Sequence, residues 1–474
     1  MLTFKNDDEF WTSSGRVQFI RDSARHERAG VWAVLQATLT RVSVVTPPNV
    51  VIPAFVGSRY GSLNYFVALV GMSSDGKGTA VSTAEKLVRD DLGAETTTPV
   101  SGEGLTTLFA RRDLMPDKDD DKRDAGTTLK CVNCRALLDV AEVTSLGAAI
   151  GRSGSTLLGT LTSAWSGENL GGQNVSEAKR LRAVAYGYRL GLITGVQPGN
   201  SDILTREDVT GLPQRIAWAN TRDPDAPPKG HKPPAPESTF GFDPAKLKAV
   251  QPTDMELNAL YQAGSYWKDL NENGSPAYPI RVLDYPDCVA DEVDEDAVNR
   301  LHGTRPAGLD GHSLFLTIKT AGLLAIMEQR PGAEFTVSED DWARAKYIVK
   351  RSREFREQCI RSGRETMRGK RRDALADEFT ARDEAREQAD REKAERDFRR
   401  YEARICTVFG RYDKGHEGLK GYVVQKRTGI PAADCYATIE RMHEADRIGT
   451  TEERAGSQIW AISPSQAQTP DSRH

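Results

Sequence analysis

The residues best suited to chemistry lie in one stretch, GMSSDGKGT, which runs from Gly71 to Thr79. A phosphate-binding loop needs glycines so that backbone N–H groups can converge on an anion, a lysine for the β- and γ-phosphates, and a hydroxyl for magnesium. Gly71, Gly76 and Lys77 have that spacing, but Gly78 stands where Ser or Thr is usual and displaces the hydroxyl to Thr79. We therefore predict a site for ATP and Mg²⁺. Its expected contacts are Gly71, Ser73, Ser74, Asp75, Gly76, Lys77, Gly78 and Thr79.

The flanks of the loop favour this interpretation. The apolar run LNYFVALV precedes the loop and is typical of a strand, and AVSTAEKLV follows it with the pattern of a helix. A strand that leads into a glycine loop and then into a helix is the context that such a motif requires. The alternative is a glycine turn that only joins a strand to a helix.

Hydrolysis would also need carboxylates, one to hold Mg²⁺ and one to orient water. Asp139 follows the apolar run Ala136 to Leu138 and is the predicted Mg²⁺ ligand, together with Thr79. Glu142, three residues further on, would activate water as in AAA-type enzymes. Glu103 in SGEG would do so as in RecA-type enzymes, where the residue ends the strand between the two motifs. Glu142 is slightly favoured, and a surface or capping carboxylate is the alternative for either residue.

Two further polar residues lie next to predicted strands. Gln197 follows LGLITGV, where its side chain could sense the γ-phosphate. Arg215 in TGLPQR is placed to project from the far side of the core toward a neighbouring subunit's nucleotide, as an arginine finger. Each could instead be an ordinary hydrogen-bonding residue.

Apolar runs alternate with helical stretches along the chain, which predicts an α/β fold with a P-loop NTPase core of the RecA or AAA type. The runs are continuous, so the strands should be buried on both faces of a parallel sheet. The main predicted strands are VVIPAFV, LNYFVALVG, KCVNCRALLDVAEV, YRLGLITGVQP and QRIAWAN.

The sequence also predicts how the chain is divided. We expect an N-terminal segment of two helices (1–46), the ATPase core (47–310) with a proline-rich loop (222–238), a helical region with a basic stretch (311–372), a charged helical linker (373–400), a winged helix (401–463) and a disordered tail (464–474). The linker has interleaved charges and almost no apolar stripe, which favours a solvated spacer helix over a coiled coil. In the winged helix, three helical patterns precede a strand, a turn and a strand.

The net charge of −4 gives no global nucleic-acid signature, so any DNA-binding surface must be local. Between Trp342 and Arg372, twelve Lys or Arg residues occur against three acids. The predicted DNA contacts are Lys370, Arg371 and Arg372, with Lys426, Arg427 and Arg441 in the winged helix. Two alternatives stay open: the basic charges could meet the acids downstream, and the winged helix could bind protein.

The remaining composition indicates a cytoplasmic protein. The polar start of the chain is unlike a signal peptide, and no apolar run is long enough to span a bilayer. Of the six cysteines, Cys131 and Cys134 form a CxxC pair, but a zinc site would need two more ligands and none is nearby in sequence. We interpret both as ordinary residues of a strand or hairpin.

With these residues in view, the chain resembles a known family. The segments FWTSSGRVQFIRDSARHERAGVWAVLQATLTRV, SLNYFVALVGMSSDGKGTA, STLLGTLTSAWSGENLG and TGLPQRIAW look like the P-loop ATPase module of actinobacterial phage and plasmid replication proteins. These proteins are often described as replicative-helicase-like, and relatives carry the module behind a primase-polymerase domain. The resemblance covers roughly Glu9 to Ser352 and implies ATP-driven work on DNA. No primase-polymerase domain precedes the module here, so it does not imply priming.

Two functions follow as expectations. The first is a DNA helicase or translocase, assembled as a hexameric ring with ATP between subunits and the winged helix guiding DNA, alongside other replication proteins. The second is a replication initiator or helicase loader that uses ATP as an assembly switch and does not unwind DNA. The wording GKGT also occurs in nucleoside monophosphate kinases, but the winged helix and the resemblance weaken that third reading.

Overall fold

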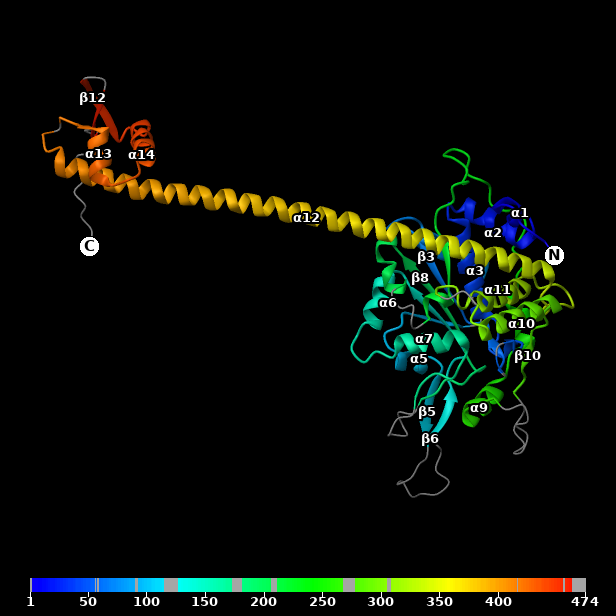
Figure 1. Ribbon diagram of the computed structural model, residues 1–474. Helices are drawn as coiled ribbons and strands as arrows, with labels where there is room; N and C mark the ends of the chain where they lie inside the picture. Colours follow the sequence, from blue (N-terminus) through cyan, green and yellow to red (C-terminus); the bar gives the residue numbers. More distant parts are fainter. Residues whose placement is uncertain are drawn as a thin grey trace, which may run out of the picture. The chain divides into compact units, whose positions relative to one another are not determined.

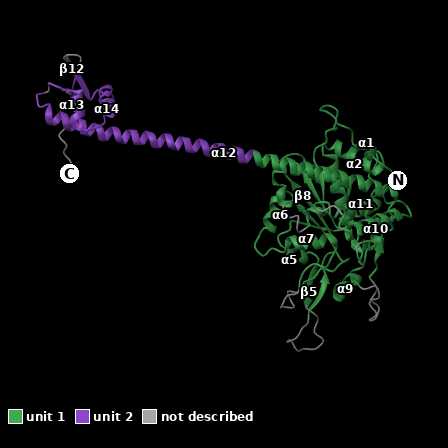
Figure 2. Ribbon diagram, viewed as in Figure 1, with its two compact units in different colours: residues 1–368 green, residues 369–474 purple. Residues whose placement is uncertain are grey.

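A computed structural model of the chain describes residues 2–55, 57, 59–89, 93–114, 127–172, 181–205, 211–266, 278–304, 308–415, 417–454 and 457–462. The chain divides into two compact units, unit 1 (1–368) and unit 2 (369–474), which Figure 2 distinguishes by colour. Unit 1 is an α/β structure around a parallel sheet, and unit 2 combines helices with a small antiparallel sheet.

Five strands form the central sheet of unit 1, in the order β4-β7-β8-β3-β9. Their bounds are β3 Tyr65–Val70, β4 Glu95–Thr97, β7 Arg135–Val140, β8 Arg189–Val196 and β9 Ile216–Asn220. All neighbouring strands are parallel, and β3 and β8 are buried along their whole length. This confirms the parallel sheet expected from the continuous apolar runs. The carboxyl ends of β3, β7, β8 and β9 therefore share one edge.

Helices pack on the sheet, and Figure 1 shows β3 and β8 between α3 on one side and α6 and α7 on the other. Every residue of α3 (Val31–Val45) is buried, so this helix belongs to the core of unit 1. Three helices precede the sheet where two were predicted, because the first pattern breaks into α1 (Asp7–Trp11) and α2 (Gly15–His26). The break lies at Ser14, whose side chain caps α2 by accepting from the N–H groups of Arg16 and Val17.

The other elements of unit 1 surround this core. The helices are α4 Lys77–Leu87, α5 Gly102–Thr107, α6 Val143–Ile150, α7 Leu157–Ser166, α8 Asp202–Thr205, α9 Asp254–Ala263, α10 Asp287–Leu301 and α11 Ser313–Glu328, with 3₁₀ helices η2 Pro198–Asn200, η4 Pro213–Arg215 and η5 Pro244–Val250. A small sheet joins β1 Val50–Ile52, β2 Gly61–Ser62 and β10 Arg281–Val282, and a hairpin joins β5 Ala110–Leu114 to β6 Thr127–Cys131.

The predicted strand KCVNCRALLDVAEV is in fact two strands, since β6 ends at Cys131 and β7 begins at Arg135. The amide of Asn133 closes the turn between them: its Oδ1 accepts from the Arg135 N–H at 3.0 Å and its Nδ2 donates to the Arg135 carbonyl at 2.6 Å. Cys131 thus ends a hairpin strand, and Cys134 precedes a strand of the central sheet.

Two buried cations hold the amino-terminal end of the sheet. Arg189, the first residue of β8, donates to the carbonyls of Thr46, Pro47 and Val50 and to Ser62 Oγ. Lys319 of α11 donates to the carbonyls of Ser62, Asn64 and Trp165, at 2.6, 3.0 and 2.6 Å. Burial lowers the pKa of Arg189 to about 9 and lowers the pKa of Lys319 well below its ordinary value.

The proline-rich loop (222–238) contains no helix or strand and packs on α2. Arg28 donates to the Pro228 carbonyl at 3.2 Å, and His26 Nδ1 lies 3.0 Å from the Pro233 carbonyl. The proline carbonyls are the acceptors in both contacts, which tie the loop to the end of α2.

A single helix, α12 (Glu339–Tyr412), runs through the predicted boundaries at 372/373 and 400/401. Its first part covers the open edge of β9, where Ser352 Oγ accepts from the Trp218 N–H at 2.7 Å. The helix continues through both positions because Ala, Glu, Arg and Lys dominate the sequence on both sides of each, and these residues all favour continued helix.

Unit 2 contains the end of α12 and two further helices around their own apolar core. The elements are β11 Leu419–Lys420, α13 Gly421–Thr428, α14 Ala432–Glu444, β12 Ile448–Arg454 and β13 Ser457–Ile462. The strands form an antiparallel sheet in the order β11-β13-β12. Phe409, Ile439 and Trp460 are among the buried residues of the core. The short strand β11 was not predicted, and the predicted tail lies outside the described residues.

Among the helices that the structure describes, none combines the length and the apolar character needed to cross a membrane.

Candidate nucleotide site

The loop after β3 has the backbone shape of an anion site. Ser74 and Gly76 both adopt left-handed conformations, with φ of 68° and 81°, which curl the loop tightly. Gly76 is the N-cap of α4, so Lys77 is the first residue of that helix. The first N–H groups of a helix have no partner within it and, with the helix dipole, they favour an anion. The strand, loop and helix lie where the sequence predicted them.

Lys77 lies over this loop. Its Nζ donates to the carbonyls of Gly71 at 2.9 Å and Met72 at 3.0 Å, and lies 3.4 Å from Glu142 Oε1. A pocket of about 560 Å³ opens beside it, and Thr79, Asp139 and Glu142 also line this pocket. The structure therefore brings the predicted lysine, hydroxyl and both carboxylates to one cavity.

The second carboxylate oxygen of Glu142 accepts a hydrogen bond from Gln197. Gln197 Nε2 lies 3.3 Å from Glu142 Oε2, so the carboxylate bridges a lysine that follows β3 and an amide that follows β8. Glu142 itself follows β7. Three predicted residues that are far apart in sequence thus form one polar chain, Lys77–Glu142–Gln197, at the carboxyl edge of the sheet.

Gly195 makes this chain possible. Because β8 lies between β3 and β7, the side chain of Lys77 must cross β8 to reach Glu142. A Cβ atom at Gly195 would lie 2.1 Å from the Ala141 carbonyl oxygen and 3.0 Å from Lys77 Cε. Only glycine leaves room for the lysine and for the turn after β7.

Asp139 and Thr79 are suited to hold Mg²⁺. Asp139 is half-buried, and its backbone carbonyl accepts from Thr98 Oγ1 at 3.1 Å. Burial raises the pKa of the Asp139 carboxyl, and Glu85 acts in the same direction while Arg41 opposes it. A buried carboxylate beside another acid in a polar pocket suits a hard cation with oxygen ligands, and Thr79 supplies a hydroxyl in the same pocket.

Glu103 does not end a strand, contrary to one of the two predictions for the water-activating residue. It lies in the first turn of α5, because Ser101 caps this helix by accepting from the Gly104 N–H. Its carboxylate accepts from Thr156 Oγ1 at 3.2 Å, and the residue does not line the loop pocket.

Arg215 does not project outward as the arginine-finger prediction requires. It lies in η4, donates to the Gly211 carbonyl at 2.8 Å and packs over the Trp165 ring, 5.4 Å from the ring centroid. Burial lowers the pKa of this guanidinium. A buried aromatic surface and a nearby carbonyl together draw the side chain inward.

Sequence reasoning missed two residues of this site, Gly195 and Arg222. Arg222 follows β9 and forms an ion pair with Asp75 of the loop, 3.2 Å from Nη2 to Oδ2. The Met72 N–H and Arg222 lower the pKa of Asp75. Each residue had a signal in the sequence: a glycine inside an apolar strand marks close approach, and Arg222 lies two residues after the predicted strand QRIAWAN.

The basic stretch of α12 is partly neutralised within unit 1. Five of its twelve cations pair with acids there, and the pairs are Arg344–Asp341, Lys346–Glu292, Arg351–Asp7, Arg353–Asp310 and Arg356–Asp310. Most of these acids come from other elements rather than from the downstream helix. Exposed cations without an ion pair among the described residues are Lys350, Arg361, Arg364, Arg368, Lys370 and Arg371, and Arg372 lies 3.9 Å from Asp373.

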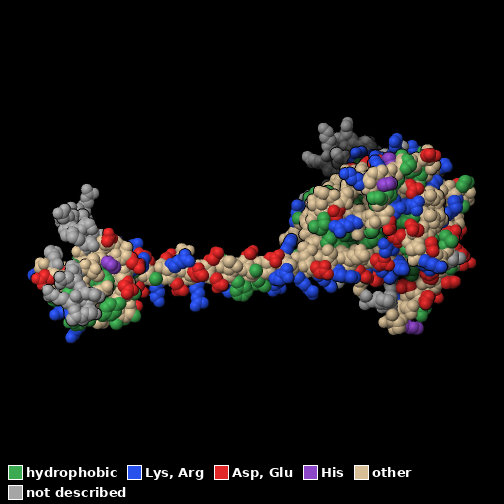
Figure 3. Space-filling view, turned by 90° about the horizontal axis from the view of Figure 1, so that it is seen from above, with side chains coloured by type: hydrophobic (Ala, Val, Ile, Leu, Met, Phe, Trp, Pro, Cys, Tyr) green, Lys and Arg blue, Asp and Glu red, His purple; other side chains and the backbone are tan. Residues whose placement is uncertain are grey.

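In unit 2 the predicted DNA-binding residues have different surroundings. Lys426 and Arg427 are exposed on α13, and Arg427 lies over the Tyr412 ring. Arg441 of α14 instead pairs with Glu395 and lies over the Phe398 ring, 4.0 Å from its centroid. Figure 3 shows charges of both signs along α12 in this unit. Arg441 is therefore paired within unit 2 while its side chain remains half-exposed, and its contact with DNA stays a prediction.

No protein-family model and no curated protein matches the chain. Among solved structures, the SCCmec type IV Cch active helicase matches at 10% sequence identity and a TM-score of 0.18. The match covers 90% of this chain and spans 66% of the length of that protein chain. A TM-score this low carries no argument about fold or function.

We predict that Gly195→Ala impairs both nucleotide binding and the stability of the fold. The added methyl group would push Lys77 and the turn at Ala141 apart, at a cost of about 1–3 kcal/mol in stability. The affinity for a fluorescent ATP analogue should fall at least tenfold, or about 1.4 kcal/mol. Gly159→Ala in α7 is the control, because a Cβ there meets nothing within 4 Å. Unchanged nucleotide affinity in Gly195→Ala would contradict the crossing of β8 by Lys77.

A second prediction follows from the pKa of Asp139. Because folding raises this pKa, the folded chain binds more protons than the unfolded chain between the two pKa values, and stability falls as pH rises through that window. Asp139→Asn removes the buried charge, so denaturant unfolding at pH 7 should show a more stable protein. The gain should shrink toward about pH 4, near the unfolded pKa. Asp377→Asn on the exposed face of α12 is the control, and a less stable Asp139→Asn at pH 7 would refute the assignment.

Proposed function

We propose that the chain is a P-loop ATPase that couples ATP hydrolysis to movement along DNA, as a helicase or translocase of a phage or mobile-element replication system. The observation that supports it best is the chain Lys77–Glu142–Gln197 beside Asp139, at the carboxyl edge of a parallel sheet and next to a loop shaped for an anion. The core would then be a P-loop NTPase of the RecA or AAA type.

Each residue of the polar chain Lys77–Glu142–Gln197 then has a role in hydrolysis. Lys77 exchanges its loop carbonyls for the β- and γ-phosphate oxygens of ATP. Asp139 and Thr79 would hold Mg²⁺, which supplies positive charge against the phosphates when bound. Glu142, no longer paired with Lys77, accepts a hydrogen bond from water and orients it, while Gln197 keeps the carboxylate in place. Nucleotide binding would thus break the ion pair with Lys77 and leave the Glu142 carboxylate able to bind water.

DNA would meet the exposed cations of α12, from Arg361 to Arg372, and Lys426 and Arg427 of unit 2. The order of helices and strands in unit 2 supports a winged helix, in which the exposed Arg441 of α14 pairs with Glu395. Assembly into a hexameric ring is also part of the proposal and rests on the resemblance, because the inward position of Arg215 does not support a shared site.

The alternative is an ATP-switched initiator or helicase loader that binds DNA without unwinding it. The observation that favours it is again in unit 2, where Asp434, Glu440 and Glu444 of α14 are exposed and Arg441 is paired. Such a surface suits a protein partner better than DNA. Strand displacement from a forked duplex would support the first function, and ATP-dependent assembly without displacement would support the second.

We predict that Glu142→Gln binds ATP and hydrolyses it slowly. The amide keeps the size of the side chain but cannot accept a proton, so kcat should fall about 10²-fold or more. Lys77→Ala should lose ATP binding as well, because its ammonium contacts the phosphates. Steady-state phosphate release, with and without single-stranded DNA, measures both.

Glu103→Gln is the matched control, since Glu103 is the rival candidate and bonds only to Thr156 among the described residues. It should hydrolyse ATP at the wild-type rate. A slow Glu103→Gln together with an active Glu142→Gln would reverse the assignment. Wild-type activity in all three variants would remove the ATPase proposal.

The DNA part of the proposal has a separate test. Reversing Lys370, Arg371 and Arg372 to Glu should weaken DNA binding regardless of sequence. The slope of log affinity against log salt should also decrease by about 2 to 3, since each phosphate contact contributes about 0.7–0.9. The matched control reverses Arg382, Arg386 and Arg391, exposed residues of the same helix that lie among acids. If the two triple reversals weaken DNA binding equally, the affinity for DNA depends only on net charge and not on these three positions.

A further inference from the structure

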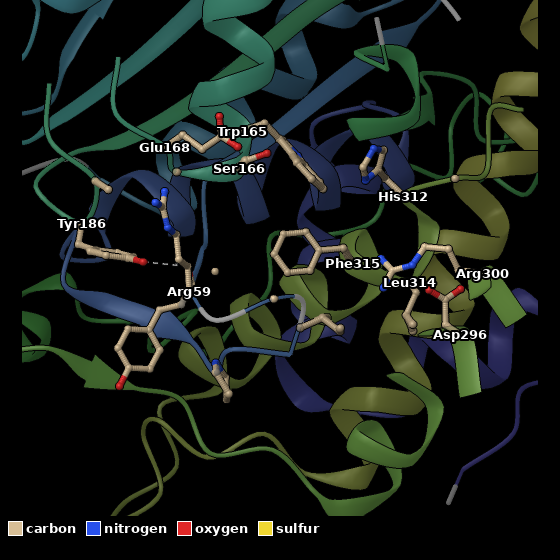
Figure 4. Close-up of a pocket in the computed structure, with 18 residues that line it drawn as sticks. Arg59, Trp165, Ser166, Glu168, Tyr186, Asp296, Arg300, His312, Leu314 and Phe315 are labelled. Atoms are coloured by element: carbon tan, nitrogen blue, oxygen red, sulfur yellow. Dashed lines mark hydrogen bonds between the residues drawn. The ribbon is translucent and has the colours of Figure 1, made fainter. Parts of the chain in front are cut away.

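A second pocket, of about 400 Å³, lies at the other end of the central sheet (Figure 4). Tyr60 and Gly61 precede β3, and Tyr186 precedes β8, so the pocket is at the amino-terminal ends of the strands. The nucleotide loop follows the six residues of β3, roughly 20 Å away at about 3.3 Å per residue. Nothing in the proposed ATPase site uses this pocket.

One wall of the pocket is aromatic and rigid. Trp165 forms edge-to-face pairs with Phe315 and His312, with ring centroids 5.4 and 5.8 Å apart. Lys319 holds the tryptophan in place, because its Nζ donates to the Trp165 carbonyl and lies 4.2 Å from the ring centroid. Figure 4 shows Phe315 between the two ends of the pocket, with Trp165 close to it. A flat ligand would meet a preformed surface here.

The opposite wall contains Tyr60 and Tyr186. Tyr186 has a φ of 66°, a left-handed conformation that costs a non-glycine residue about 1–3 kcal/mol. Contacts on both sides hold it there, since Tyr278 Oη donates to its carbonyl at 2.5 Å and its own hydroxyl donates to the Tyr60 carbonyl at 3.3 Å. Strain held in place by surrounding contacts is common at ligand sites.

Charged groups stand at the ends of the pocket. Figure 4 shows Arg59 and Glu168 on the side of Tyr186, and Arg300 and Asp296 on the side of His312. Arg59, Glu168 and Arg300 are exposed, and among the described residues no hydrogen bond or ion pair occupies their charged groups. The pocket thus offers stacking surfaces, the carboxylate of Glu168 and guanidinium donors to one ligand.

This combination selects a ligand class. An aliphatic ligand would leave the charged groups without partners, and a simple anion would leave the aromatic rings and the Glu168 carboxylate without partners. A nucleobase with an exocyclic amino group can stack on Phe315 and donate to a carboxylate, as cytosine and adenine do in protein complexes. Its phosphate can then pair with the guanidinium of Arg59.

We propose that this pocket binds one nucleotide whose base carries an exocyclic amino group, with the base against Phe315 and the phosphate at Arg59. The two sources of such a ligand are a base of single-stranded DNA and a free nucleotide. The choice of a DNA strand as the first source rests on the proposed function. The pocket then reads base identity, which the cations of α12 cannot do.

The test measures binding without ATP, so that it does not depend on hydrolysis. Fluorescence anisotropy compares oligo(dA), oligo(dC) and oligo(dT) of roughly 15 nucleotides at one salt concentration. The phosphate contribution is then common to all three. Oligo(dA) and oligo(dC) should bind about tenfold more tightly than oligo(dT), because thymine has no exocyclic amino group.

Variants locate this preference. Phe315→Ala should remove it by loss of stacking, and Glu168→Ala should remove it by loss of the acceptor at an exposed position. Tyr422→Ala, an exposed aromatic residue of α13, is the control and should keep the preference. All these variants should keep wild-type ATP hydrolysis in the absence of DNA, whereas Lys77→Ala should lose hydrolysis and keep the base preference.

Competition by dAMP separates the sources. If dAMP displaces oligo(dA) from the wild type but not from Arg59→Ala, the ligand is a free nucleotide; if oligo(dA) binds with the preference and dAMP does not compete, it is a base of a strand. Equal affinity of the three oligonucleotides, together with no dAMP binding, would overturn the proposal. So would a preference that survives in both Phe315→Ala and Glu168→Ala.

Discussion

The ion pair between Lys77 and Glu142 crosses the width of strand β8, and the rest of the site depends on this contact. Neighbouring strands lie about 4.7–4.9 Å apart, so β3 and β7, on either side of β8, are separated by roughly 10 Å. A lysine can bridge that distance only if nothing stands between, and Gly195 provides the gap. The same strand ends in Gln197, which holds the far oxygen of Glu142. β8 therefore lies between the two charged residues, and Gly195 and Gln197 of this segment allow and support their contact.

The opposite end of the sheet is held by buried cations. Arg189 and Lys319 both bond to Ser62, through its hydroxyl and its carbonyl, and together they fix the chain that enters β3. Buried carbonyls need donors, and a guanidinium and an ammonium supply several donors each from a single side chain. The cost of burying the charges is large. The result is a rigid amino-terminal edge, and the aromatic pocket lies on this edge because Lys319 also fixes Trp165.

Helix α12 connects the basic surface to the nucleotide site within unit 1. Gly363 packs so closely on the loop after β8 that a Cβ atom there would lie 2.3 Å from the Pro198 carbonyl oxygen. Pro198 directly follows Gln197, and a Cβ atom at Gly363 would also lie 2.6 Å from Ser201 Oγ. Arg361 and Arg364 lie within two residues of Gly363, so exposed cations of α12 neighbour the contact with the loop that follows Gln197.

The sequence by itself determined the local part of this protein. The strand, glycine loop and helix around Lys77 follow from consecutive residues, since apolar runs, glycines and helix formers act over a few positions. It also placed Asp139, Glu142 and Gln197 at the ends of strands. Only the tertiary structure decided which strands are neighbours, because pairing depends on contacts between distant segments. That order joined Glu142 to Lys77, left Glu103 on a helix away from the pocket, and turned Arg215 inward onto Trp165. The role of Gly195 and the aromatic pocket were likewise beyond the sequence, because each depends on the space left when several elements pack together.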